Sequence, residues 1–470
     1  MRIFKVSELL SALKPHEKTA FGDFLRSPFH NQNGTLPQLY SLLLEDSSLH
    51  LEANRKDIYR HLFPGKKYSD KEVRYIFTEF NRLLEHFFAI REFEKDSREY
   101  LLTTQRALLK RKAGKAYAHA RLRFNGLEKT ENAYYYLDRF RAAELFHSFQ
   151  SSSLSRLSES DYDEILSGLD KFYFLRKLQL QCELVNLKNI LKKEYNNQLI
   201  REISILTVAY NYFNSPFLEI YYHILQMLTI DDEETENHFN SVVLLIKKHQ
   251  SNFPVADVNY IYQYVKNFCI RRINKGEDAY RQKLFEIYKE ILSNRRIMNH
   301  DYFSPFEYKN IVTLGLRLNE DKWVKQFIPK YINYLPPADR KNALTYNTAM
   351  LNFYLKNYRM VIKGLQEVEF TDLYYQMDSR SILLKVYFET DETETMLHHI
   401  SAFKIFLRRN KLISDFQRSI YQNFIRYTLK IFRAGQSKSK LEKLRSEILS
   451  AGNISDRNWL LEKVNEELAD

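Results

Sequence analysis

The sequence predicts an all-α protein in which helical hairpins repeat along the chain. Three observations support this fold class. The 470 residues include only 11 glycines and 10 prolines, whereas about 12% of an average protein is glycine or proline, so the turns that β-sheet folds need are scarce. Apolar residues recur at helical spacing along most of the chain. In the last third this pattern itself repeats about every 35 residues. A chain of this length is also too long for one compact core, which favours an elongated array or several domains.

The repeat is clearest between residues 310 and 410. One apolar stripe consists of Tyr358, Val361, Ile362, Leu365 and Val368. The same offsets occur upstream at Val324, Phe327, Ile328, Tyr331 and Tyr334, and downstream at Thr393, Met396, Leu397, Ile400 and Phe403. The helices that precede these stripes keep the same register at Leu314, Ala349 and Leu384. Short polar elbows at 319–321, 355–357 and 390–392 separate the two helices of each pair. One such pair cannot bury its own apolar face, so we expect neighbouring pairs to stack.

A unit of two helices and 34–35 residues resembles the tetratricopeptide repeat. The resemblance covers roughly residues 215–430. Ala349 occupies the small position of the first helix, and Trp323 and Tyr358 match the aromatic residue that opens the second helix. The small residue of the second helix is replaced by Gln326, Val361 and Met396.

This resemblance implies a right-handed stack of hairpins, a tetratricopeptide-like solenoid, whose concave face binds a peptide, a helix or another protein. By the same resemblance the contacts would come from the first helix of each pair. The candidate groove residues are Asn310, Arg317, Asn347, Tyr354 and Arg380. The function expected on this basis is that of a non-catalytic scaffold or adaptor.

Composition divides the chain into three predicted parts. Residues 1–150 form an N-terminal helical segment, 151–432 the helical repeats, and 433–470 a pair of C-terminal capping helices. The serine-rich stretch 151–160 is the predicted linker between the first two parts. In the N-terminal segment we expect two helices within 1–45, separated at 27–34, and a capping box of Ser69 and Glu72 that starts a third helix. Pro329 should bend or split the helix that contains it.

The sharpest charge feature is the segment 100–127, which carries seven basic side chains and no acid within a chain of net charge +12. These residues are Arg106, Lys110, Arg111, Lys112, Lys115, Arg121 and Arg123. Tyr117, His119 and Phe124 lie among them and could stack on bases if they are exposed. The alternative function is therefore that of an RNA- or ribosome-associated factor. Helical projection scatters the seven charges around the axis, so two helices with basic solvated faces explain the same residues.

No motif predicts catalysis, a cofactor or a metal site. Glu144 and His147 form a single E-x-x-H, whereas di-iron bundles need two such pairs. The stretch 64–69 lacks the spacing of a phosphate-binding loop. Cys182 and Cys269 fall within apolar helical patterns, so we expect buried, reduced thiols in a cytoplasmic protein. The N-terminus shows no signal-peptide pattern, and no apolar run approaches the roughly 18 residues that span a bilayer.

Overall fold

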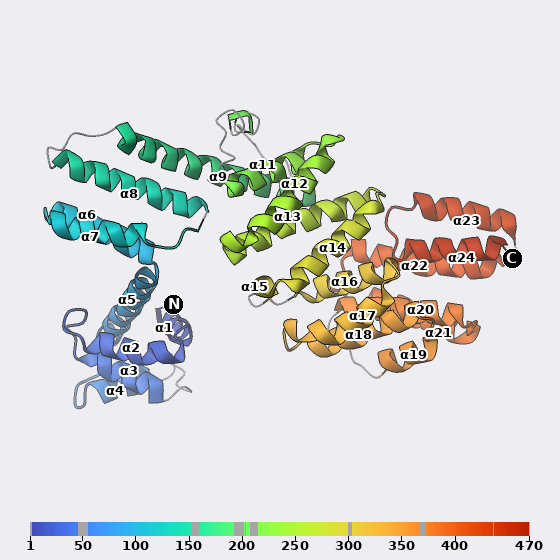
Figure 1. Ribbon diagram of the computed structural model, residues 1–470. Coiled ribbons are helices and arrows are strands. Elements are labelled where there is room, and N and C mark those ends of the chain that lie inside the picture. The colour runs from blue at the N-terminus through green and yellow to red at the C-terminus, as the bar shows by residue number, and fades with distance from the viewer. Residues whose placement is uncertain are drawn as a thin grey trace. The chain divides into compact units, whose positions relative to one another are not determined.

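The computed structural model describes residues 2–45, 55–130, 132–152, 159–191, 202, 204–206, 215–298, 303–366, 373–435 and 437–469. Within these ranges the protein is helical and contains no strand, which confirms the predicted all-α class (Figure 1). The internal contacts divide the chain into two compact units, Met1–Tyr222 and His223–Asp470. The three-part division predicted from composition stays a prediction, and residues 153–158 of the predicted linker lie outside the described residues.

The first unit begins with five helices around one apolar core. These are α1 (Arg2–Ser11), α2 (Pro15–Arg26), α3 (Thr35–Glu45), α4 (Arg55–Leu62) and α5 (Asp70–Lys95). Phe21, Phe80 and Phe87 lie at the centre of this core, where Phe21 meets both other rings at centroid distances of 5.7 and 5.3 Å. The long helix α5 contacts α1, α2 and α3, so it forms the spine of the bundle.

Two local predictions for this bundle need correction. Residues 1–45 hold three helices, because Pro15 starts a helix of its own and holds Lys14 extended, with ψ of 157°. At the start of α5 the Ser69 hydroxyl accepts a hydrogen bond from the backbone N–H of Glu72, as predicted. The Glu72 carboxylate instead accepts the hydroxyl of Tyr59 from α4. The capping box is therefore half formed, and the Glu72 carboxylate instead connects α5 to α4.

The rest of the first unit contains two helical hairpins among its described residues. The first hairpin pairs α6 (Ser97–Lys110) with α7 (Gly114–Asn125), and the second pairs α8 (Ala133–Ser152) with α9 (Glu159–Leu191). Helix α6 also packs against α8. Cys182 on α9 is a buried free thiol, as predicted, and Cys269 in the second unit is another. The division between the units falls within α11 (Pro216–Thr229).

The second unit is a sequential array of helix pairs. Its first helices are α13 (Val255–Asn274), α16 (Pro305–Arg317), α18 (Arg340–Tyr354) and α20 (Leu373–Glu389). Its second helices are α12 (Glu234–His249), which follows α11, and α14 (Ala279–Ser293), α17 (Asp321–Tyr331), α19 (Tyr358–Gln366) and α21 (Thr393–Arg409). Helix α16 contacts α18 and α18 contacts α20, while each of α17 and α19 contacts the first helix that follows it. The predicted stacking of consecutive pairs is thus observed from α16 to α21.

The array continues into three C-terminal helices, and short segments connect its members. Helices α22 (Asp415–Ala434), α23 (Lys438–Ser450) and α24 (Arg457–Ala469) contact one another. The short helix α15 (Arg295–Met298) lies before α16, and the 3-10 turn η2 (Gln250–Asn252) follows α12. Pro329 lies inside α17, which ends two residues later and continues as the 3-10 turn η3 (Ile332–Tyr334), so the helix is interrupted as predicted.

The polar elbows within the pairs share one backbone geometry. Lys112, Asn319, Lys356 and Asp391 each adopt a left-handed φ between 55° and 59°. The next amide in each elbow bonds to the carbonyl five residues back, for example Asn357 to Asn352 at 2.8 Å. This is the Schellman arrangement, which usually places glycine at the left-handed position. The elbow between α13 and α14 does use glycine, at Gly276 with φ of 95°. The low glycine content therefore reflects elbows that are built from ordinary residues.

We expect Lys356→Gly to raise the free energy of unfolding by about 1 kcal/mol, because glycine relieves the left-handed strain at this position. Urea unfolding followed by circular dichroism measures the change. The matched control is Lys363→Gly, an exposed position within α19, which should lower the free energy of unfolding by about the same amount. Equal effects of the two glycines would contradict the elbow geometry.

Candidate interaction surfaces

The first helices of the array converge on one side, which we call the inner face. Lys309 of α16 forms an ion pair with Asp378 of α20, two pairs further along. Such a contact bypasses α18, whose Tyr346 ring lies 5.5 Å from the Lys309 ammonium. Tyr421 of α22 donates its hydroxyl to the same Asp378 at 2.8 Å. The inner face between α18 and α22 is thus occupied by the protein's own polar contacts.

The C-terminal helix α24 packs on α20. Trp459 donates its indole N–H to Glu389 at 2.7 Å, and Lys463 pairs with the other oxygen of Glu389 at 3.0 Å. Trp459, Leu460 and Val464 are buried, whereas Glu462 and Asn465 remain exposed. One apolar face turned toward the array and one polar face turned toward solvent is the arrangement expected of a capping helix.

The structure gives the five predicted groove residues different surroundings. Asn310 and Arg317 of α16 are exposed and therefore accessible. Asn347 has no exposed surface and donates its side-chain amide to Ala343 at 2.7 Å. Tyr354 is partly exposed and bonds through its hydroxyl to Asn319 of the preceding elbow. Arg380 stacks on the Phe406 ring of α21 at 4.1 Å, so it lies between two helices of its own pair.

An accessible part of the inner face lies on α13 and α16. On α16 the exposed or half-exposed positions Phe306, Asn310, Thr313 and Arg317 follow helical spacing on one side. On α13 the positions Tyr260, Gln263 and Ile270 do the same. Lys266 of α13 forms an ion pair with Glu307 of α16, which joins the two helices beside these rows. We call this surface the α13–α16 surface; its aromatic members Tyr260 and Phe306 are 64% and 52% exposed.

Charge is distributed unevenly between the two ends of the second helices. Several begin next to acidic elbows and end in basic residues. Helix α12 follows Asp231, Asp232 and Glu233 and ends in Lys247 and Lys248. Acids at helix N-termini and bases at C-termini complement the helix dipole, so this polarity has a sufficient structural cause.

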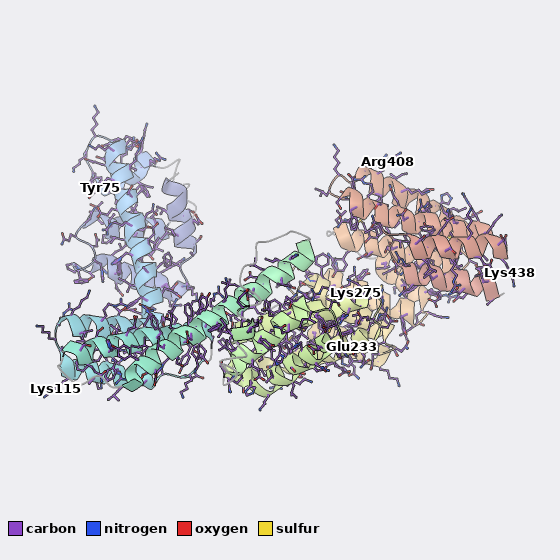
Figure 2. All side chains as sticks on the ribbon, turned by 90° about the horizontal axis from the view of Figure 1, so that it is seen from above. Tyr75, Lys115, Glu233, Lys275, Arg408 and Lys438 are labelled. Carbon is purple, nitrogen blue, oxygen red and sulfur yellow. The ribbon has the colours of Figure 1, made fainter. Side chains whose placement is uncertain are left out.

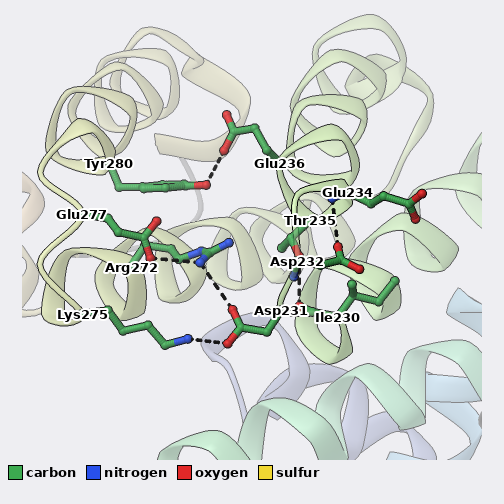
Figure 3. Close-up of polar contacts among 10 residues, drawn as sticks. All are labelled: Ile230, Asp231, Asp232, Glu234, Thr235, Glu236, Arg272, Lys275, Glu277 and Tyr280. Atoms are coloured by element: carbon green, nitrogen blue, oxygen red, sulfur yellow. Dashed lines mark hydrogen bonds and ion pairs between the residues drawn. The ribbon is translucent and has the colours of Figure 1, made fainter.

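Part of the acidic elbow before α12 is tied to the next pair (Figure 3). Asp231 accepts Lys275 at 2.8 Å and Arg272 at 3.4 Å, and Arg272 also pairs with Glu277 at 2.9 Å. The hydrogen bond from Lys275 lowers the pKa of Asp231 below its usual value. Further along α12, Glu236 accepts the hydroxyl of Tyr280. These contacts hold consecutive elbows together, so we assign them to packing of the array.

The seven basic residues of 100–127 lie on the α6–α7 hairpin. Lys110, Arg111, Lys112 and Lys115 gather at the turn between the two helices, where Figure 2 shows Lys115. Arg106 and Arg123 are exposed along the helices, and Arg121 stacks on the Phe146 ring of α8 at 3.2 Å. Tyr117 and Phe124 are buried, so they are not available to stack on bases. We call the four residues at the turn the basic turn; they form no ion pair with any residue that the structure describes.

A partly buried polar cluster holds this hairpin on α8. Arg141 of α8 pairs with both oxygens of Glu99 on α6, at 2.6 and 3.0 Å. Asp138 lies 3.4 Å from the same guanidinium, and its side chain is 15% exposed. Burial raises the pKa of Asp138 to about 6, and the attraction of Arg141 does not offset it, because Glu99 holds that guanidinium.

We expect Asp138→Asn to stabilise the protein at pH 7.5 by about 1 kcal/mol and to lose this benefit at pH 4.5. A carboxyl whose folded pKa lies above its unfolded value contributes most stability below the unfolded pKa, near 3.9, and loses it as the pH rises through about 6. Urea unfolding at the two pH values measures this difference. The exposed Asp57→Asn serves as control and should change the free energy of unfolding at pH 7.5 by less than about 0.5 kcal/mol. An Asp138→Asn effect of equal size at both pH values would contradict the assignment.

The comparisons with known proteins add no relative. No protein-family model matches the chain, and neither the curated proteins nor the solved structures contain a match. The described residues hold no group of three or more His, Cys, Asp or Glu arranged to bind a metal ion. None of the described helices is both long and apolar enough to cross a membrane.

The sequence reasoning missed Tyr260 and Phe306 as exposed aromatic residues and missed the inner-face contact between Lys309 and Asp378. That pair is separated by 69 residues, which is twice the repeat length. Oppositely charged residues that lie on two first helices, two repeat lengths apart in the sequence, are the signal that could have indicated this ion pair. The exposed aromatic residues carry no comparable signal, because 66 Tyr and Phe residues occur in the chain and most positions at helical spacing face the core.

Proposed function

We propose that this chain is a non-catalytic scaffold of the tetratricopeptide-like class that binds a segment of another protein on the α13–α16 surface. The single observation that carries the proposal is that surface itself: two first helices that an ion pair joins present exposed aromatic and polar side chains. In tetratricopeptide-like arrays the first helices line the binding face, and the resemblance to that class therefore supports the choice of these first-helix residues.

The chemistry of the α13–α16 surface indicates the kind of segment. Exposed aromatic residues dominate the energetics of many interfaces, so Tyr260 and Phe306 would contact apolar side chains of the partner. Arg317 at the end of α16 would pair with a carboxylate of the partner segment. Asn310, between Phe306 and Arg317 on the same helix, would form a hydrogen bond through its side-chain amide with the main chain of that segment. The partner segment is thus expected to combine apolar side chains with at least one acid.

Affinity capture from the native host with and without nuclease tests this function. The tagged wild-type chain should retain a protein partner after nuclease treatment, and Tyr260→Ala with Phe306→Ala should lose it. The matched control is Leu244→Ala, an exposed apolar residue on α12 away from the surface. Recovery of the same partner with the double variant, or its loss after nuclease, would contradict the proposal.

A second candidate function is RNA or ribosome association through the basic turn. The concentration of four cations at one hairpin turn, without ion-pair partners in the described structure, favours it. If the basic turn together with the exposed Arg106 and Arg123 neutralises roughly six phosphates, binding of structured RNA should weaken about a thousandfold between about 50 and 200 mM salt. Reversal of Lys110, Arg111 and Lys112 to Glu should abolish it. The same reversal at exposed Lys66, Lys67 and Lys71 on the first bundle is the control, and equal effects of the two triples would exclude a specific site.

A further inference from the structure

We propose that the end of α21 and the loop after it dock on an anionic lipid surface and insert Leu412 and Phe416 into it. We call this surface, which lies within residues 404–416, the α21 tip. Its exposed side chains are of two kinds, the cations Lys404, Arg408, Arg409 and Lys411 and the apolar Ile405, Leu412 and Phe416. The α21 tip shares no residue with the α13–α16 surface or the basic turn, so the inference goes beyond both functions proposed above.

The apolar side chains of the α21 tip gather at one end of a helical hairpin. Leu412 is 85% exposed in the loop that follows α21, and Phe416, in the first turn of α22, is 61% exposed. Four residues of chain separate the two, so their backbones lie within about 14 Å of each other. A single exposed leucine needs no explanation, but several large apolar side chains at one loop indicate an interaction site.

Hydrogen bonds within the loop keep Leu412 exposed. The Arg418 guanidinium donates to the carbonyls of Leu407 at 2.8 Å and Ile413 at 3.0 Å, on either side of Leu412. The Asn410 side-chain oxygen accepts the N–H of Leu412 itself at 3.1 Å. Ile413 is buried in the C-terminal core, so the loop turns one apolar side chain inward and its neighbour outward. A side chain that is already held in its exposed position loses little entropy when it docks.

The cations of the α21 tip surround these apolar side chains and are available to a partner. None of the four forms an ion pair with a residue in the described part of the chain. The segment 404–416 contains a single acid, Asp415, and its carboxylate lies 3.8 Å from Arg418. The segment itself therefore carries four exposed cations against one acid, and its charge complements an anionic surface.

An anionic lipid surface fits this combination of side chains. Lipid headgroups supply phosphates for the cations, and each cation near such a surface strengthens binding about fivefold. The boundary below the headgroups supplies an apolar medium for Leu412 and Phe416. RNA offers phosphates, but an aliphatic side chain such as Leu412 neither stacks on bases nor pairs with phosphate. Docking of this kind reaches only the headgroup region and requires no membrane-spanning helix.

Cosedimentation of the full chain with vesicles tests the charges. At about 150 mM salt, wild type should bind vesicles that contain phosphatidylglycerol and phosphatidylcholine at least about tenfold more tightly than vesicles of phosphatidylcholine alone. Reversal of three cations should weaken binding to the mixed vesicles about a hundredfold or more; the changes are Arg408→Glu, Arg409→Glu and Lys411→Glu.

The matched control reverses three exposed cations of α23, namely Lys438→Glu, Lys440→Glu and Lys443→Glu. Figure 2 shows Lys438 away from Arg408 within the second unit, so this triple should change vesicle binding less than about threefold. Equal effects of the two triples, or a wild type that binds no vesicle, would overturn the proposal. RNA binding that the first triple abolishes, without vesicle binding, would overturn it in favour of a nucleic-acid site.

A fluorescent label at residue 412 tests insertion. Cys182 and Cys269 are buried, so the folded Leu412→Cys variant should take a nitrobenzoxadiazole label at the new cysteine. Mixed vesicles should shift the emission of this label to the blue, whereas the same label in Leu244→Cys on α12 should not respond. Leu412→Ser with Phe416→Ser should weaken vesicle binding about tenfold, with an unchanged circular dichroism spectrum. Vesicle binding without a blue shift at residue 412 would overturn the insertion of the α21 tip.

Discussion

Lys385→Met should lower the free energy of unfolding by about 3–4 kcal/mol, since it leaves a partly buried carboxylate without its cation. The Lys385 ammonium lies 2.8 Å from Asp456, and Lys385 is only 5% exposed. Burial alone would raise the pKa of Asp456, but the ion pair with Lys385, the Ser455 hydroxyl and the charge of Arg317 together lower it. The contact joins α20 to the start of α24, so we expect the loss to loosen the capping helix first.

The pH dependence of this variant follows from the same contact. With its pKa lowered, Asp456 contributes stability above its unfolded pKa near 3.9 and loses that contribution as the pH falls. Without Lys385 the carboxyl should titrate at a higher pH, so the deficit should be largest near pH 7 and smaller near pH 4. Urea unfolding at both values measures it.

The matched control is Lys430→Met, which removes the ammonium from an exposed pair with Glu447 at 2.5 Å. Exposed pairs contribute about 0–1 kcal/mol, so this variant should unfold almost as wild type does. Addition of Asp456→Asn to Lys385→Met should recover part of the loss, because the uncompensated charge is then gone. Equal effects of the two lysine variants would show that burial of the Lys385 pair has no energetic consequence.

Sequence reasoning recovered the features that depend on local periodicity. The all-α class, the paired helices between 310 and 410 and the elbows at Asn319, Lys356 and Asp391 all follow from the spacing of apolar and polar residues. The predicted stripes are largely buried, for example at Val324, Val361 and Ile400, although Thr393 and Leu397 are exposed and Val368 lies outside the described residues. Periodicity identifies which side of a helix is apolar. In a stacked array that side packs against the neighbouring helix pairs.

The candidate sites depend on tertiary geometry, which periodicity does not contain. Whether a polar residue on a first helix reaches the inner face depends on how the helices cross, so Asn310 is exposed whereas Asn347 is buried. Tyr117 and Phe124 could have been recognised as core residues, because they lie seven residues apart on the apolar side of α7 together with Ala120. The contacts that close the C-terminal array join residues about two repeats apart, such as Glu389 and Trp459 at a separation of 70.

Arg418→Met should lower the free energy of unfolding by about 2–3 kcal/mol, because four main-chain carbonyls lose a charged donor. Arg418 of α22 reaches the end of α21 and the loop that follows it. Its guanidinium donates to the carbonyls of Leu407 at 2.8 Å, Arg408 at 3.4 Å, Asn410 at 3.5 Å and Ile413 at 3.0 Å. The last carbonyls of a helix have no partner within it, so one arginine here completes the C-terminus of α21.

The same arrangement, an arginine that donates to main-chain carbonyls after a second helix, recurs in the array. We therefore expect loss of such an arginine to be destabilising at other helix ends as well. Arg296 donates to the carbonyls of Gln250, Ser251 and Phe253 after α12, and Arg340 to those of Asn333 and Leu335 after α17.

Arg418→Lys tests the geometry, because an ammonium is a point donor and cannot span carbonyls on both sides as the planar guanidinium does. We expect Arg418→Lys to recover less than half of the loss in urea unfolding. The control Arg409→Met removes an exposed arginine from the end of α21 and should change the free energy of unfolding by less than about 0.5 kcal/mol. If Arg418→Met and Arg409→Met were equally mild, water would satisfy these carbonyls as well as the arginine does.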